Sequence, residues 1–185
     1  MRTAVLRLAA VLMPLALIAC GGKAASPSPL ATAQPSGAFS PGVLPSSDQL
    51  CQLLTVEDWS AAGLTGATAP TIDDDGPNTG SAYCTYGGQS GATGGLELDV
   101  FVDQTLDGAQ ATFATIAQSL PPSQPPNVSG IDDGLINTNI DPGFGAILVR
   151  AGKLVVTITL PTSAQAGDQL TSLTQTVLSR ALALE

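Results

Sequence analysis

Apolar and polar residues alternate along residues 96–103, with four aliphatic side chains on one side and Glu97, Asp99 and Asp103 on the other. Alternation with a period of two is typical of a half-buried β-strand. Only Phe101 breaks the pattern, so we expect it either to face solvent or to pack under another element. The stretch 82–87 also reads as a strand, and a glycine-rich segment separates the two.

A second alternating stretch covers residues 154–160 and follows 146–150 across a short Ala-Gly-Lys turn. The two stretches predict a β-hairpin. Thr157 and Thr159 lie on the side of the second strand that we expect to face solvent. Residues 135–138 are consistent with one further short strand.

Three stretches have helical spacing instead. Thr55 and Asp58 resemble a capping box, which predicts a helix over residues 56–62 that ends at Gly63. Apolar residues recur every three or four positions over 109–120 and again over 170–182. Pro121 ends the first of these two stretches. Trp59, the single tryptophan, is expected to be an anchor of the core.

The order of these elements predicts the fold class. Strand, strand and helix follow each other over 82–120, and the same order recurs over 146–184. We therefore expect an α+β fold in which helices pack on one face of an antiparallel sheet, and the repeated order suggests a β-β-α duplication. The repeat rests on element order and not on residue identity.

The first seven residues contain two arginines, Arg2 and Arg7, and no acid. A twelve-residue apolar run follows, which is too short to span a membrane and fits a secretory signal. The run ends in Leu-Ile-Ala-Cys, which resembles the bacterial lipobox. That resemblance implies cleavage between Ala19 and Cys20 and lipid attachment at Cys20. Residues 1–19 are thus predicted to be a signal peptide and 20–47 a lipidated, Pro/Ser-rich tether. Residues 48–185 are predicted to form one globular domain.

Charge narrows the range of partners. The chain carries a net charge of −9, and loss of residues 1–19 leaves four basic against 15 acidic residues, or −11. Binding to nucleic acid requires clustered Lys and Arg, so no nucleic-acid partner is expected. The predicted contact with the cell membrane is the lipid at Cys20, which would hold the domain on the extracytoplasmic face.

Three cysteines are present. If Cys20 carries the lipid, Cys51 and Cys84 remain as a pair in an oxidising compartment. A structural disulfide between them is the favoured interpretation, and two buried thiols or a redox pair are the alternatives. Redox pairs usually lie close in sequence, and these two cysteines do not.

Catalytic motifs are absent from the sequence. Without histidine, Ser-His and Cys-His nucleophile systems and histidine-bound zinc are excluded. Asp73, Asp74 and Asp75, and separately residues 137–141, do not match the spacing of an EF-hand calcium loop. We therefore expect no catalytic residue, no metal ligand and no cofactor. A carboxylate-dependent hydrolase remains as a less favoured alternative, because paired acids alone can hydrolyse glycosides.

Two short motifs carry a resemblance to a known family. Residues 51–57, C-Q-L-L-T-V-E, and residues 84–86, C-T-Y, resemble small actinobacterial cell-envelope lipoproteins of unknown function, which have C-x-L-L-T-x-E and a later C-T-W. Tyr86 stands where that family has tryptophan. The resemblance implies an envelope lipoprotein with a linking disulfide, and it supplies no catalytic residues.

The sequence therefore predicts a non-catalytic binding module of the cell envelope that takes up a hydrophobic or other ligand or an envelope protein. An accessory or scaffold protein without a small-molecule ligand is the alternative. A hydrophobic ligand would require an internal apolar cavity.

Overall fold

The structure, a computed structural model, describes residues 44–73, 79–87, 95–121, 123–140 and 143–182. They all belong to one compact unit, Pro35–Glu185. Its elements in chain order are α1 (Ser47–Cys51), α2 (Val56–Ala61), β1 (Thr71–Asp73), β2 (Ser81–Thr85), β3 (Glu97–Val102), α3 (Leu106–Ala117), β4 (Asp133–Ile140), β5 (Phe144–Ala151), β6 (Leu154–Pro161) and α4 (Ala166–Leu182). None of the helices in these ranges is long and apolar enough to cross a membrane.

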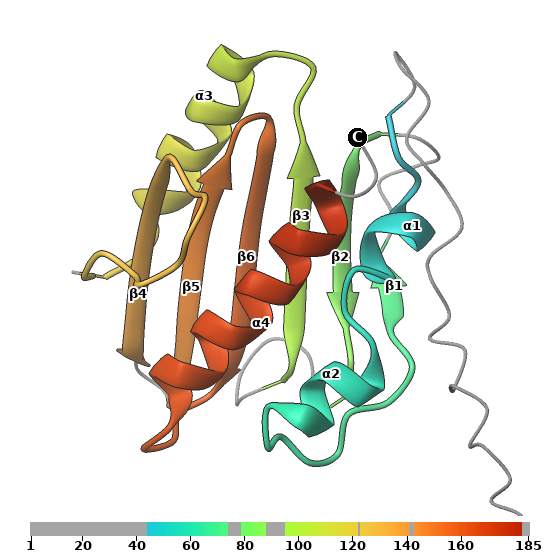
Figure 1. The fold of residues 1–185 in the computed structure, drawn as a ribbon, viewed down its shortest axis with the longest axis vertical. Helices are drawn as coiled ribbons and strands as arrows, with labels where there is room; N and C mark the ends of the chain where they lie inside the picture. Colours follow the sequence, from blue (N-terminus) through green and yellow to red (C-terminus); the bar gives the residue numbers. More distant parts are fainter. Residues whose placement is uncertain (1–43, 74–78, 88–94, 122, 141–142, 183–185) are drawn as a thin grey trace, which may run out of the picture. The chain divides into compact units, whose positions relative to one another are not determined.

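The strands form one antiparallel sheet in the order β1-β2-β3-β6-β5-β4 (Figure 1). Two three-stranded meanders, β1-β2-β3 and β4-β5-β6, meet where β3 pairs with β6. This central register places Glu97 opposite Thr159, Asp99 opposite Thr157 and Phe101 opposite Val155. The predicted antiparallel α+β fold is thus confirmed.

One face of the sheet carries the main core. Alternate residues of β2, β3, β5 and β6 point into it, among them Leu98, Val156 and Ile158, and all three are fully buried. Helices α1, α2 and α4 cover this face, with α4 crossing in front of the central strands in Figure 1. The buried stripe of α4, which includes Leu170, Leu173 and Val177, matches the predicted helical spacing.

Helix α3 differs from the expectation that the helices share one face. It packs on the opposite face, where Phe113 and Ile116 contact Leu148 and Val155 (Figure 1). The physical reason is that β5 and β6 are apolar on both faces at this point, so the second face also needs a cover. Phe101 belongs to this second cluster, so it packs under another element and does not face solvent.

The repeat is therefore present in the order of elements but not in the placement of the helices. β3 and β6 run antiparallel, so a two-fold axis relating the two meanders would be normal to the sheet. Such an axis would leave both helices on the same face. Since α3 and α4 lie on opposite faces, the two strand-strand-helix units are not related by such an axis.

Local signals placed most elements within a few residues. The capping box of Thr55 and Asp58 is present at the start of α2, and Gly63 adopts a positive φ of 80° just after its end. Gly152 makes the β5–β6 turn with a φ of 58°. Helix α1 and strand β1 were not expected, and β4 is twice as long as the predicted strand because it pairs along most of β5.

Candidate functional site

The predicted lipid-attachment residue Cys20 and its neighbour Ala19 lie outside the described residues. The other predicted pair is joined: Cys51 at the end of α1 and Cys84 in β2 form a disulfide, with 5.7 Å between their Cα atoms. Both residues are buried in the core. The alternative of two buried free thiols is therefore wrong, while a redox pair stays an untested alternative, and the bond fixes α1 to the sheet.

The aromatic residues around the disulfide have a structural role. The hydroxyl of Tyr86 donates a hydrogen bond to the carbonyl oxygen of Cys51. The rings of Tyr86 and Trp59 are 5.2 Å apart and tilted by 50°. Trp59 is 0 % exposed, which confirms it as a core anchor. Its Nε1 has no hydrogen-bond partner, but the whole side chain lies inside the apolar core, so no ligand reaches it from the surface.

A half-buried ion pair joins α2 to α4. Arg180 donates hydrogen bonds to both carboxylate oxygens of Asp58, at 2.6 and 2.8 Å, and to the carbonyl oxygen of Leu53. Burial alone would raise the pKa of Asp58, but Arg180 and Thr55 outweigh it and hold that pKa below its ordinary value. The pair completes a helix cap and an inter-helix contact, so it has a structural role.

The two acidic stretches form no metal site among the residues that the structure describes. Asp73 belongs to β1, and residues 74–78 of the first loop lie outside the described residues. The second stretch lies in β4 up to Ile140, where the side chain of Asn137 accepts a hydrogen bond from the backbone N–H of Asn139. Within the described ranges, no three Asp, Glu, Cys or His side chains come together in a way that could hold a metal ion.

A polar hollow of about 400 Å³ lies at the edge of the sheet, bordered by residues 124–127, by 136–139 of β4 and by the first turns of α4. Its lining includes four amide side chains, those of Gln124, Asn127, Asn137 and Asn139, and the carboxylate of Asp168. No buried, unpartnered side-chain atom is found among its described residues. The hollow therefore has no buried polar atom that needs a hydrogen bond from a ligand.

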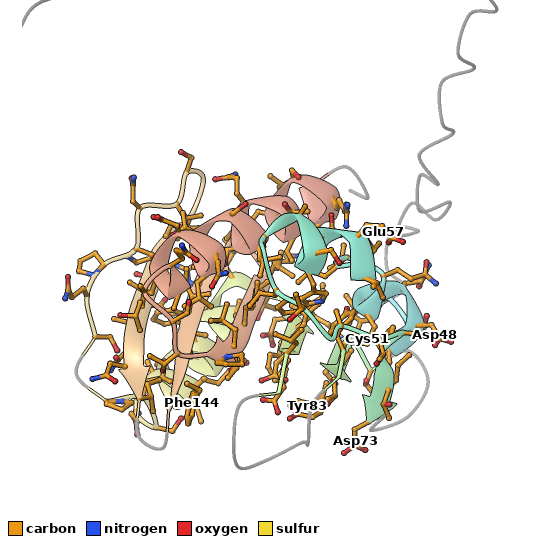
Figure 2. The ribbon with its side chains drawn as sticks, turned by 90° about the horizontal axis from the view of Figure 1, so that it is seen from below. Asp48, Cys51, Glu57, Asp73, Tyr83 and Phe144 are labelled. Carbon is orange, nitrogen blue, oxygen red and sulfur yellow. A yellow bond between two sulfur atoms is a disulfide. The ribbon has the colours of Figure 1, made fainter. Side chains whose placement is uncertain are left out.

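A different surface does contain buried polar atoms without hydrogen-bond partners. On the sheet face that carries α3, two rows of polar side chains cross the strands beyond the helix. The first row places Asp73, Tyr83, Asp99 and Thr157 side by side, and the second places Thr71, Thr85, Glu97 and Thr159. We call these eight residues the polar rows. Figure 2 shows Tyr83 and Asp73 on the side of the sheet opposite the helices α2 and α4.

Two buried oxygen atoms in the polar rows have no hydrogen-bond partner. They are Oδ1 of Asp99 and Oγ1 of Thr157, which belong to directly opposed residues of β3 and β6. Thr157 is only 7 % exposed. Buried polar atoms are nearly always hydrogen-bonded, and each exception needs an explanation. Here two exceptions lie side by side.

The Asp99 carboxyl group is also electrostatically unusual. Burial raises its pKa from 3.8 to about 7, and the neighbouring Glu97 carboxylate contributes to the rise. The three basic residues of the described chain leave it without a counter-ion: Arg150 and Arg180 pair with other acids, and Lys153 is exposed beyond the end of β5. A carboxyl group with such a pKa is about half protonated near neutral pH.

Tyr83 flanks this carboxyl group on the neighbouring strand. Burial, a hydrogen bond to Glu97 and the charges of Glu97 and Asp99 raise the pKa of Tyr83 to about 12. The phenol therefore stays protonated at physiological pH and donates to Glu97. Tyr83, Glu97, Asp99 and Thr157 form the candidate functional site.

From the sequence alone, Glu97 and Asp99 are only polar residues on a solvated strand face, and Thr157 is predicted to be exposed. The face was correct but the burial was not. Helix α3 covers the adjoining row of Phe101 and Val155. The nearest sequence signal was a pair of acids two residues apart in a strand, and that signal alone does not reveal burial.

Comparison of the chain with protein-family models, with curated protein sequences and with solved structures found no match.

Proposed function

We propose that this protein is an exported, lipid-anchored component of the cell envelope, and that its folded domain is a non-catalytic module that binds a ligand at Tyr83, Glu97, Asp99 and Thr157. The lipobox-like residues 17–20 support the anchor. The Cys51–Cys84 disulfide supports an oxidising compartment outside the cytoplasm, because such bonds are rare in the cytosol.

The observation that carries the binding function is the pair of unpartnered oxygens, Asp99 Oδ1 and Thr157 Oγ1. Leaving a buried polar group without a partner costs about 1–3 kcal/mol. A threonine and an aspartate placed together at that cost make physical sense if a ligand supplies the missing hydrogen bonds. Perturbed carboxyl groups of this kind cluster at functional sites.

Hydrolysis is the second candidate, and one observation favours it. Burial raises the pKa of Asp99 to about 7, so this carboxyl group can supply a proton near neutral pH, and Glu97 adds a second carboxyl group two residues along the same strand face. It ranks lower because neither acid lines the polar hollow described above.

Ligand retention tests the binding function. Full-length protein is extracted from membranes in detergent, incubated with small molecules from the envelope, washed, and analysed by mass spectrometry. We expect a compound retained by the wild type and lost from Asp99→Asn and Thr157→Val. The matched control Asp107→Asn, which removes an exposed carboxylate from α3, should retain it. Equal retention by all variants would refute the site.

The same preparation separates the alternatives. Chemical turnover of the retained compound, abolished by Glu97→Gln, would favour the hydrolase. No retained compound, together with a protein recovered by crosslinking in intact envelopes, would favour a scaffold.

Localisation is tested separately with Cys20→Ser. We expect this variant to be found as uncleaved or soluble protein with its disulfide intact. Mature-length protein that stayed fully in the membrane fraction would contradict the lipid anchor.

A further inference from the structure

The candidate site is rich in hydrogen-bond acceptors, although the Thr157 hydroxyl and the protonated form of Asp99 can each donate one hydrogen bond as well. Asp99 presents a buried carboxyl oxygen, Thr157 a buried hydroxyl oxygen, and Glu97 a second carboxyl group on the same strand face. The fourth member, Tyr83, donates a hydrogen bond to Glu97 and keeps its proton. What this set lacks is a group with several N–H or O–H donors.

The spacing allows one donor group to reach all three acceptors. Directly opposed residues such as Asp99 and Thr157 have Cβ atoms about 5 Å apart. Residues i and i+2 of a strand, such as Glu97 and Asp99, lie about 7 Å apart. A single nitrogen between them can therefore lie within about 3 Å of an oxygen from each side chain.

Charge selects among donor groups. Glu97 and Asp99 are both acidic, and the described chain places no cation against them. An anionic ligand would be repelled, and a neutral alcohol offers one donor for each hydroxyl group and no compensating charge. A primary ammonium group offers three N–H donors and one positive charge. The ring of Tyr83 next to the site suits a cation as well, because aromatic faces attract positive charge.

We propose that the candidate site binds a small protonated primary amine, whose ammonium group donates to Asp99 Oδ1, Thr157 Oγ1 and the Glu97 carboxylate. The proposal rests on the proposed binding function and adds the chemical class of the ligand. The two unpartnered oxygens and the absence of a facing cation in the described chain are the observations that carry it.

Binding is expected to depend on pH. The ammonium group favours the ionised form of Asp99, so below a pH of about 7 the carboxyl group must first release its proton. Other facing groups do not reverse this dependence: Glu97 is on the same strand, Tyr83 on β2 stays protonated, and Asp73 lies at the far end of its row on β1. β6 carries no titratable side chain, and α3 contributes only the exposed Asp107.

The test is isothermal titration calorimetry of the full-length protein in detergent with ethanolamine. Phosphate buffer is used, because Tris is itself a primary amine. Choline is the matched probe that keeps the charge but has no N–H donor, and ethylene glycol keeps the size but has no charge. We expect ethanolamine to bind at least tenfold more tightly than either. From pH 8 to pH 5.5 its affinity should fall by about thirtyfold, as protonation of one group with a pKa near 7 requires.

Variants connect binding to the site. Asp99→Asn and Thr157→Val should each reduce ethanolamine affinity by at least tenfold, and Glu97→Gln should also weaken it. Asp107→Asn, which removes a carboxylate outside the site, should bind like the wild type. An affinity for ethanolamine no greater than that for choline, or unchanged in Asp99→Asn, would overturn the amine proposal.

Two further arms complete the experiment. Titration with Nα-acetyl-lysine amide distinguishes a free amine from a lysine side chain of a protein; tighter binding than ethanolamine would identify the protein-borne amine as the source of the same chemistry. If ethanolamine fails while an envelope compound is retained in an Asp99-dependent way, the amine class is wrong and the binding function stands. If both fail, the binding function is wrong as well.

Discussion

Replacing Asp99 by asparagine should make the protein more stable at alkaline pH, which is the reverse of what most substitutions in a structured region do. Burial first, and Glu97 second, raise the pKa of Asp99 from an ordinary 3.8 to about 7. Between these values the folded protein keeps a proton that the unfolded chain releases. The folding stability of the wild type therefore falls as pH rises from about 4 to about 7, and falls no further above that.

The size of the effect follows from the shift. Each pKa unit corresponds to about 1.4 kcal/mol, so a shift of about three units sets an upper bound of about 4 kcal/mol. Asp99 is partly exposed, and solvent screening reduces this to about 2–3 kcal/mol. Asparagine has nearly the same shape and carries no charge. Asp99→Asn should thus match the wild type at pH 4 and exceed it by about 2–3 kcal/mol at pH 8.

The assay is urea denaturation from pH 4 to pH 8, followed by the fluorescence of Trp59, the single tryptophan of the chain. Asp107→Asn, which removes an exposed carboxylate outside the candidate site, is the control, and it should not show the gain of about 2–3 kcal/mol at pH 8 expected for Asp99→Asn. Parallel stability curves for the wild type and Asp99→Asn, or a less stable Asp99→Asn at pH 8, would refute the burial of this charge.

Three further substitutions probe the scaffold. Replacing Cys51 and Cys84 together by alanine should lower the free energy of unfolding by about 3–4 kcal/mol, because the bond closes a loop with a sequence separation of 33; chemical denaturation measures this. Arg180→Met should lower the free energy of unfolding by about 2 kcal/mol at pH 7, and by progressively less as pH falls below 4. The reason is that the pKa of Asp58 is lowered in the folded protein, so its ion pair stabilises the fold only while the carboxylate is ionised. A loss that did not vary with pH would argue against the ion pair. Phe113→Ala should lower the free energy of unfolding by about 2 kcal/mol, and it should accelerate amide hydrogen exchange more in α3 than in α4. The reason is that Phe113 packs α3 against its own face of the sheet. Equal acceleration in both helices would contradict two separate clusters.

Short-range patterns accounted for much of this fold. The alternation around Leu98 and Val156 identified two strands that turn out to be neighbours, and the Thr55–Asp58 box placed the start of α2. Both signals depend on a few adjacent residues, so they can be recognised without any knowledge of tertiary contacts. Strand β1 escaped prediction because its three residues have no buried side chain, and pairing with β2 alone defines it.

The face chosen by α3 could not be predicted in the same way. A helical stripe such as Ala109 and Phe113 shows that one side of a helix is buried, but it does not say against which surface. That choice depended on Leu148 and Val155, which make β5 and β6 apolar on their second face as well. Leu148 lies in a continuous apolar run from Ala146 to Val149, and a continuous run indicates a strand covered on both faces.

The candidate site was missed for a related reason. Sequence alternation assigned Asp99 and Thr157 to the polar face correctly, and polar faces usually meet solvent. Thr157 and one carboxyl oxygen of Asp99 are buried where α3 docks over the adjoining row, at Phe101 and Val155, and this contact is invisible in the strand sequences. Helix α3 ends its contact one row before Asp99 and Thr157, so it supplies no hydrogen-bond partner for their two buried oxygens. If Asp99→Asn is more stable than the wild type at pH 8, stability cannot explain why a carboxylate occupies this position, and a functional role, ligand binding or the less favoured hydrolysis, becomes the physical reason for it.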